Sequence, residues 1–61
     1  MTRAEAERVA ARLVTVSGDE DGWFIRIAGS IHDFVACEEL REERAAQARE
    51  AIVRALVEEE R

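Results

Sequence analysis

Apolar and polar positions follow two different periods along this 61-residue chain, and the changes of period divide it into successive segments. Near the start, four apolar residues recur at the spacing of one helical face: Ala6, Val9, Ala10 and Leu13. Thr2 and Glu5 stand before them in the order of a capping box, in which both side chains satisfy free amides of the first turn. The pattern predicts a helix over residues 2–11, which at this length must dock on another element to be stable.

The next two segments have β character and lie on either side of an acidic turn. Residues 13–16 are short and rich in β-branched side chains. Residues 23–28 alternate, with Trp23, Ile25 and Ile27 on one face and Phe24, Arg26 and Ala28 on the other. Between them, residues 18–22 hold two glycines around three consecutive acids, Asp19, Glu20 and Asp21, a composition that predicts the turn of a hairpin.

Residues 31–37 fit two structures. As a strand, they pair back on the second strand through a tight turn at Gly29 and Ser30. As a helix, they begin at Ile31 behind a capping box of Ser30 and Asp33, and continue to the end of the chain for about thirty residues, beyond the roughly 8–20 residues of a typical globular helix. We favour the strand, because the apolar positions of this segment do not continue into the stripe that follows.

Residues 38–60 predict a long helix with one narrow apolar stripe. The stripe consists of Leu40, Ala45, Ala48, Ile52, Ala55 and Leu56, widened by Val53 and Val57. Its alanines allow a close approach to a sheet. Three glutamates at 58–60 oppose the helix dipole at a C-terminus, so we expect the last turn to fray.

Together these segments predict a single α+β domain over residues 1–61. The order is helix–strand–strand–strand–helix, with a small antiparallel sheet packed on the long C-terminal helix. The alternative is an αββα arrangement in which the last helix begins near Ile31.

Charge and cysteine content narrow the function classes. The chain has 9 basic and 14 acidic residues, a net charge of −5, and all of its basic residues are arginine. An acidic chain is poorly suited to neutralising the phosphates of nucleic acid, whereas it suits a basic protein partner. One cysteine, Cys37, excludes an internal disulfide and a thiol-based zinc site. A chain this short buries a thin core, so we expect it to self-associate as a homodimer or a higher oligomer.

The sequence shows neither a membrane or secretion signal nor a convincing catalytic or metal-binding motif. No apolar run reaches the ~20 residues of a membrane span and the start has no secretory signal, so we expect a cytoplasmic protein without membrane contact. The reactive side chains His32, Asp33 and Cys37 are spaced so that the histidine and the cysteine diverge on either a strand or a helix. The acids at 19–21 are too few for a calcium loop. We therefore predict no enzyme activity, no metal and no cofactor.

Several of these residues resemble a known family. The acidic turn followed by an aromatic strand at residues 19–25, the short segment 34–36, and the Arg/Glu/Ala-rich runs 41–43 and 48–52 look like the HicB-type antitoxin domain. In that family a D-x-D-G turn precedes an aromatic strand, and a third strand enters a helix of this composition. The resemblance covers roughly residues 13–57. Its element order is also similar to the double-stranded-RNA-binding type of fold.

The chain departs from the family pattern in three places. A proline-glycine stretch usual between the second and third strands is replaced by residues 28–33, which contain no proline. The chain ends with the long helix, where many members carry a DNA-binding segment. It also begins with an added helix. We therefore interpret it as a truncated, specialised variant without a DNA-binding segment.

The resemblance implies a non-enzymatic protein-binding module that sequesters a small basic toxin ribonuclease. The residues expected to contact that partner are Trp23, Arg26, Glu38, Glu39, Glu42 and Glu43. The alternative is a phage or mobile-element protein that binds and inhibits a host protein, with its acidic surface acting as a mimic of nucleic acid.

Overall fold

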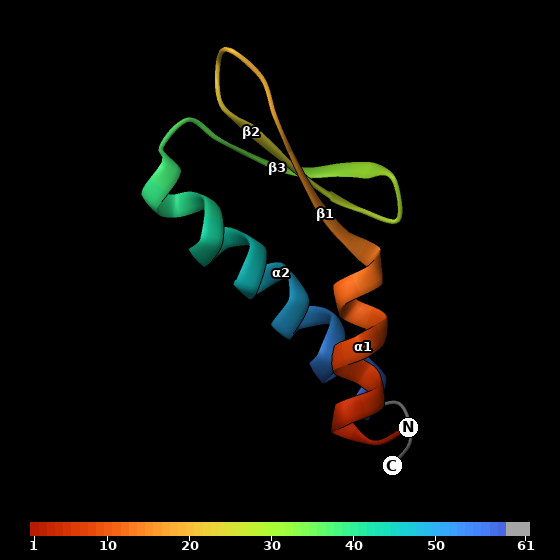
Figure 1. Ribbon diagram of the computed structural model, residues 1–61. Helices are drawn as coiled ribbons and strands as arrows, with labels where there is room; N and C mark the ends of the chain where they lie inside the picture. The colour runs from red at the N-terminus through yellow and green to blue at the C-terminus, as the bar shows by residue number, and fades with distance from the viewer. Residues whose placement is uncertain (59–61) are drawn as a thin grey trace.

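The computed structural model describes residues 1–58 and contains two helices and three strands (Figure 1). They are, in chain order, α1 (Arg3–Leu13), β1 (Val14–Gly18), β2 (Trp23–Ile27), β3 (Ser30–Val35) and α2 (Glu38–Glu58). The strands form one antiparallel sheet in the order β1-β2-β3. The predicted fold, a small antiparallel sheet packed on a long C-terminal helix, is confirmed.

Helix α1 begins as its capping residues predict. The Thr2 hydroxyl accepts a hydrogen bond from the amide of Glu5 at 3.2 Å, which satisfies one of the free donors of the first turn. The helix runs two residues beyond the predicted end, to Leu13, and the strand accordingly begins at Val14. Ala6 and Ala10 are buried on the face that the sequence pattern assigned to the interior.

The segment after β2 is a strand, so the alternative helix beginning at Ile31 is wrong. Strand β2 ends at Ile27 because Ala28 and Gly29 form a tight turn with positive φ angles of 52° and 86°. Both central residues of a type I′ hairpin turn need this conformation, which continues the twist of the flanking strands. Strand β3 then pairs with β2 from Ser30 to Val35, with an irregularity at His32.

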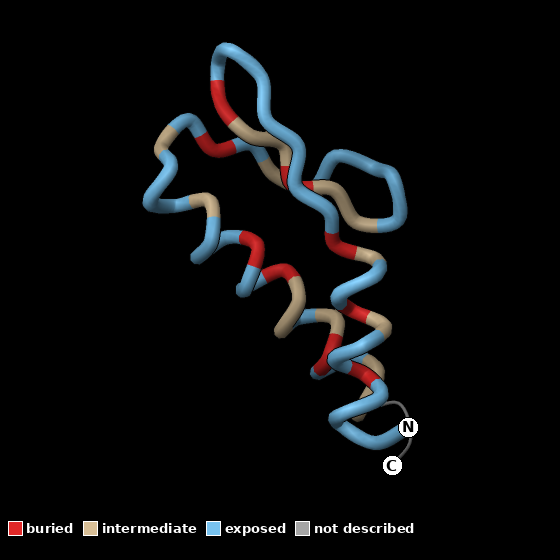
Figure 2. Tube along the Cα trace, in the orientation of Figure 1, coloured by how far each residue is buried: buried red, intermediate tan, exposed pale blue. Residues whose placement is uncertain are grey.

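One face of the sheet packs on the first half of α2, and we call it the inner face. Val14 and Ile25 form a buried cluster there with Ala45 and Ala48, and Ile27 and Ile52 pack at its border. The small alanine side chains allow the helix to lie close to the strands. In Figure 2, buried positions occur both along α2 and in the strands that lie next to it.

A second buried cluster joins the two helices. Ala6 and Ala10 of α1 meet Val53 of α2, and Ile52, Leu56 and Val57 pack around them. Helix α1 therefore covers the later half of α2, while the sheet covers the earlier half (Figure 1). Ile52 contacts both clusters, so α2 is the element that both share.

The predicted stripe of α2 is wrong at two positions, Leu40 and Ala55. Leu40 is 38% exposed, and Ala55 is exposed as well. At the first turn the residue in line with Ala45 and Ala48 is Arg41, four and seven positions earlier, and it is Arg41 that faces the sheet. The expected fraying at 58–60 concerns residues that lie, apart from Glu58, outside the described part of the chain.

Candidate protein-binding surfaces

Trp23 forms a platform with Arg41 on the inner face, at the end of the sheet next to the β1–β2 turn. The Arg41 guanidinium carbon lies 5.3 Å from the centroid of the indole ring, a cation–π contact. The ring lies over Gly18, its partner on β1, because a Cβ on that glycine would be 2.9 Å from Trp23 Cδ1. Arg41 Nε is shielded from solvent and meets no hydrogen-bond acceptor within residues 1–58. Stacking on Trp23 is therefore the contact that the buried side of this guanidinium makes.

The four predicted glutamates lie together on the exposed start of α2, and we call them the acidic end of α2: Glu38, Glu39, Glu42 and Glu43. Glu38 and Glu42 flank Arg41, with oxygens 3.9 and 3.7 Å from its guanidinium. Glu39 accepts a hydrogen bond from the Cys37 thiol at 2.9 Å. Glu43 accepts a long hydrogen bond from Gln47 at 3.4 Å. Trp23 of β2 and two glutamates of α2, Glu38 and Glu42, therefore surround the Arg41 guanidinium.

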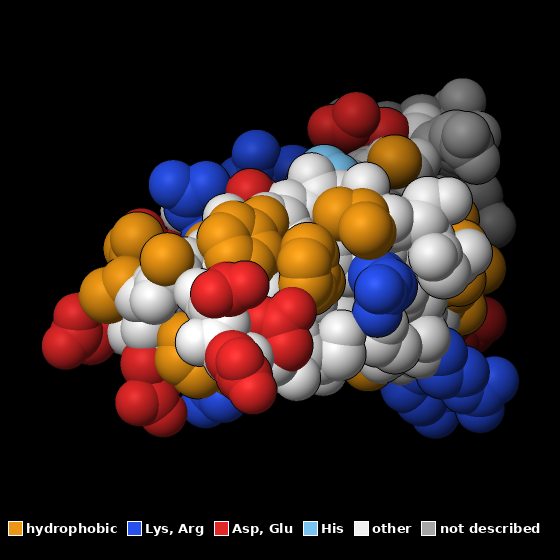
Figure 3. All heavy atoms as spheres, turned by 90° about the horizontal axis from the view of Figure 1, so that it is seen from above, with side chains coloured by type: hydrophobic (Ala, Val, Ile, Leu, Met, Phe, Trp, Pro, Cys, Tyr) orange, Lys and Arg blue, Asp and Glu red, His pale blue; other side chains and the backbone are white. Residues whose placement is uncertain are grey.

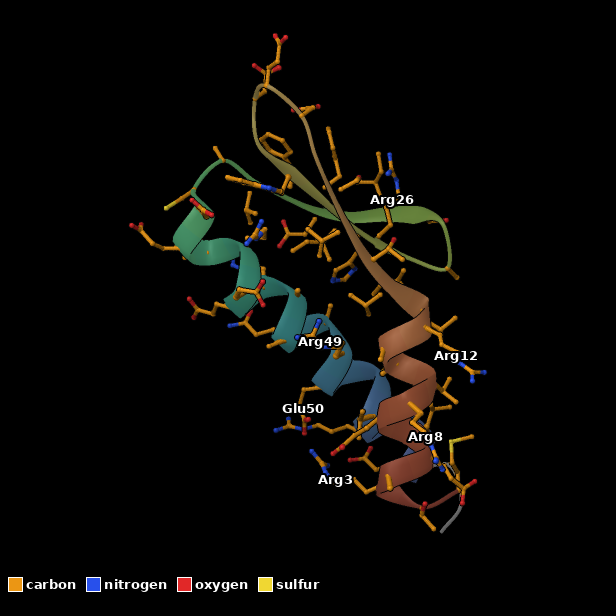
Figure 4. The ribbon with its side chains drawn as sticks, in the orientation of Figure 1. Arg3, Arg8, Arg12, Arg26, Arg49 and Glu50 are labelled. Atoms are coloured by element: carbon orange, nitrogen blue, oxygen red, sulfur yellow. The ribbon has the colours of Figure 1, made fainter. Side chains whose placement is uncertain are left out.

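Arg26 lies on the opposite face of the sheet, which we call the outer face. Its guanidinium donates a hydrogen bond to the Ser17 hydroxyl at 2.9 Å and lies 5.7 Å from the centroid of the Phe24 ring. In Figure 4 the Arg26 side chain points away from α2. The structure therefore separates Arg26 from the other five predicted contact residues.

The outer face contains apolar residues that sequence reasoning did not assign to any site. Phe24 and Phe34 face each other across β2 and β3, with ring centroids 4.9 Å apart. Phe34 is 43% exposed, and Ile31, the partner of Arg26 in the register, is 60% exposed. The alternation of β2 placed Phe24 and Arg26 on one face, but it could not tell which of two apolar faces α2 covers.

The turn between β1 and β2 is an acidic tip formed by Asp19, Glu20 and Asp21, all exposed. Asp19 Oδ1 accepts hydrogen bonds from the amides of Asp21 at 2.8 Å and Gly22 at 3.1 Å. This carboxylate therefore shapes the turn itself. Gly22 is packed closely, because a Cβ there would be 2.5 Å from the Val35 carbonyl oxygen. The other two acids of the tip project their charge into solvent.

Asp33 links β3 to α2. Its carboxylate accepts hydrogen bonds from the Phe34 amide at 2.8 Å and from the Arg44 guanidinium at 3.0 Å. The amide bond, followed by the Arg44 contact, lowers the pKa of the Asp33 carboxyl below its ordinary value. Arg44 is thereby tied to the sheet at the border of the acidic end of α2.

His32 and Cys37, the reactive side chains that the sequence analysis considered, have different surroundings. His32 is exposed at the irregularity of β3, whereas Cys37 is half-buried and directs its thiol to Glu39. Within residues 1–58, no group of three or more His, Cys, Asp or Glu side chains is arranged to hold a metal ion. Neither helix in this part of the chain has the length and apolar character that crossing a membrane requires.

A shallow cavity of about 300 Å³ lies between the two helices. Its lining residues are Glu7, Ala10, Ala11, Ala46, Arg49, Glu50 and Val53. The rim is already tied by Arg3, which bonds Glu50 at 2.8 Å and Glu7 at 3.1 Å (Figure 4). The cavity thus combines a floor rich in alanine with a charged rim that is partly tied by salt bridges.

Comparison of the chain with protein-family models, with curated proteins and with solved structures gives no match. The HicB-type resemblance therefore stays a prediction from the residues quoted above.

Proposed function

We propose that this chain is a non-enzymatic protein-binding module, antitoxin-like in its action, that sequesters a small basic protein of the toxin ribonuclease class. The single observation that carries the proposal is the acidic end of α2 beside the Trp23–Arg41 platform. Four exposed carboxylates over two helical turns attract a basic surface, and an adjacent tryptophan provides an apolar anchor.

The placement of the charges supports a protein partner over a purely structural role. Glu38 and Glu39 stabilise the start of α2 through the helix dipole. Glu42 and Glu43 lie one turn further along, where the dipole effect has faded, and both remain exposed. The two arginines of this region, Arg41 and Arg44, are held by contacts within the chain. The carboxylates are therefore the groups most accessible to an incoming cation.

The same arrangement argues against nucleic acid as the ligand. Repulsion between the acidic end of α2 and phosphate groups would oppose binding on this side of the molecule. Because Trp23 and Arg26 lie on opposite faces, one compact partner cannot reach both without wrapping the sheet edge. The proposal therefore assigns the basic partner to the Trp23 side and leaves Arg26 to the outer face.

The test uses two variants with equal changes of charge. Glu42→Gln/Glu43→Gln neutralises the acidic end of α2, and Glu7→Gln/Glu58→Gln neutralises two exposed acids elsewhere. Each variant and the unaltered chain are used to capture proteins from the native host's lysate, and the affinity of the purified partner is measured by calorimetry. We expect a small basic protein whose affinity falls about tenfold or more in the first variant and changes little in the control.

Trp23→Ala serves as an independent variant of the platform, and we expect it to weaken binding by a similar or larger factor. The purified partner should also lose its ribonuclease activity when the chain is added in equal amount. A partner bound equally well by both charge variants would overturn the proposal. Recovery of a large housekeeping enzyme instead would favour the inhibitor of a host protein.

A further inference from the structure

The outer face combines an apolar centre with opposite charges at its two ends. Phe24 and Phe34 form the centre, and Ile31 extends it on β3. The acidic tip lies at the end where Gly18 pairs with Trp23, whereas Arg26 lies toward the other end of β2. Figure 3 shows hydrophobic side chains gathered on the sheet side of the molecule, with acidic side chains next to them and a basic side chain further along.

Within residues 1–58 neither helix packs on this face, because both buried clusters lie on the other side of the sheet or between the helices. The sheet therefore leaves aromatic and aliphatic side chains in solvent, while the largest fully buried side chains of the described residues are Ile25 and Val53. Exposed apolar patches with a polar border are typical of interaction surfaces. A small domain with a thin core also gains stability from association.

We propose that the outer face binds the outer face of a second copy of this chain. The two-fold axis lies between the two sheets and runs across the strands, so that the strands of the two copies are antiparallel. This symmetry places the acidic tip of each copy over Arg26 of the other, and it repeats the contact twice. The other face-to-face arrangement, with an axis along the strands, sets tip against tip and is opposed by the repulsion of six carboxylates.

The spacing of the residues fits one position of the axis. Arg26 is three residues beyond Trp23, about 10 Å along the strand, and the tip lies a few ångströms beyond the other end of β2. A two-fold axis midway between the tip and Arg26 passes close to the Phe24–Phe34 pair. The four rings of the two copies then meet at the axis, where an apolar contact is best shielded from water.

The size of the face sets the strength of the dimer. Three strands spaced by about 4.8 Å, each about 17 Å long, cover roughly 250 Å² per copy in projection, well below the roughly 800 Å² per partner of a standard interface. Interfaces of this size belong to weak complexes. We therefore expect a monomer–dimer equilibrium in the micromolar range.

Sedimentation velocity between about 5 µM and 1 mM covers this range of dissociation constants. The unaltered chain should change from monomer to dimer across it. Ile31→Ser with Phe34→Ser should weaken the dimer at least about tenfold, because both side chains lie on the outer face. Leu40→Ser removes an exposed apolar side chain from α2 and should leave the dimer unchanged.

Charge exchange tests the symmetry. Arg26→Glu should weaken the dimer severalfold, and so should Glu20→Arg with Asp21→Arg. Asp19 is left unaltered because its carboxylate shapes the turn. A variant with all three substitutions reverses the charge on both sides of each contact. Its dimer dissociation constant should return to within a few-fold of that of the unaltered chain. Circular dichroism melts of every variant confirm that the chain is folded.

A folded chain that remains monomeric at about 1 mM would overturn this proposal and leave the outer face to a different protein. A dimer that persists when Ile31 and Phe34 are replaced, or one that the combined charge exchange fails to restore, would place the contact elsewhere. Binding of the basic partner is measured separately on the Trp23 side. The dimer and the proposed function can therefore fail independently.

Discussion

The two faces of β2 have similar side chains and very different surroundings. On the inner face Ile25 is 0% exposed and packs on two alanines of α2. On the outer face Phe24 and Arg26 cover each other, and their neighbours on β3, Phe34 and Ile31, extend into solvent. The inner face thus stabilises the fold of one chain, whereas the outer face contributes little to it. Residues of the same type should therefore respond very differently to substitution on the two sides.

The largest difference is expected between two isoleucines. Ile25→Ala should lower the free energy of unfolding by about 3 kcal/mol, because it removes a fully buried side chain and leaves a cavity. Ile31→Ala should change it by less than about 0.5 kcal/mol, because that side chain is mostly exposed. Chemical denaturation at a concentration low enough to keep the chain monomeric provides the measurement.

A domain of this size has a free energy of unfolding of only about 3–9 kcal/mol, so Ile25→Ala can unfold it outright. Ile25→Val, with an expected loss of about 1 kcal/mol, keeps the comparison measurable in that event. Equal losses at Ile25 and Ile31 would show that the outer face is also packed within a single chain.

The next effect concerns the closeness of α2 to the inner face. Ala48→Leu should destabilise the domain by about 1–3 kcal/mol, because the larger side chain cannot enter the cluster around Val14 and Ile25 without moving the helix. Ala51→Leu makes the same chemical change at an exposed position of α2 and should be nearly neutral. A Tm unchanged by Ala48→Leu would contradict the close packing of helix and sheet.

A smaller effect, of opposite sign, is expected at the turn that aligns Phe24 with Phe34. Ala28 has a φ of 52°, a conformation that costs a residue with a Cβ roughly 1 kcal/mol. Asparagine tolerates it, and Asn-Gly is the preferred pair for this type of turn. Ala28→Asn should therefore raise the free energy of unfolding by up to about 1 kcal/mol, and a lower Tm would show that the turn has another shape.

The smallest effect is a pH dependence at the edge of the inner face. The pKa of Asp33 is lowered in the folded chain, so its carboxylate stabilises the fold above the pKa of the unfolded chain, near 4, and this contribution is lost as pH falls through the folded pKa. Asp33→Asn should be less stable than the unaltered chain at pH 7. The gap should close as pH falls through the lowered folded pKa, below which both chains carry a neutral group at this position. A gap that stays constant with pH would assign the effect to packing alone.

The local elements could be predicted because their signals are contained in short stretches of sequence. Thr2 and Glu5 marked the start of α1, and the acids between Gly18 and Gly22 marked the first hairpin. The end of α1 was placed two residues early, because the change to β-branched residues at 13–16 was given more weight than the helical spacing of Leu13. Such boundaries depend on tertiary contacts that a short window does not contain.

The candidate surfaces were only partly predictable. The glutamates of α2 were recognisable as an exposed acidic group, but the contact of Arg41 with Trp23 joins residues 18 positions apart and depends on how α2 crosses the sheet. Leu40 was assigned to the apolar stripe because it is apolar, although the position in line with Ala45 is Arg41. The outer face was missed because both rows of β2 are largely apolar, and alternation alone does not say which row a helix will cover.

The position of Ile52 in both buried clusters has a consequence for the way the chain opens. A fluctuation that detaches α1 breaks the cluster around Val53 and leaves the sheet on α2, whereas a fluctuation that detaches α2 breaks both clusters. Local opening and global unfolding should therefore form a nested series. In hydrogen exchange, the amides in the middle of α2 should exchange only through global unfolding, and those of α1 should exchange sooner. Helix α2 should therefore be the last element to open, although the strands that pack on it come earlier in the sequence.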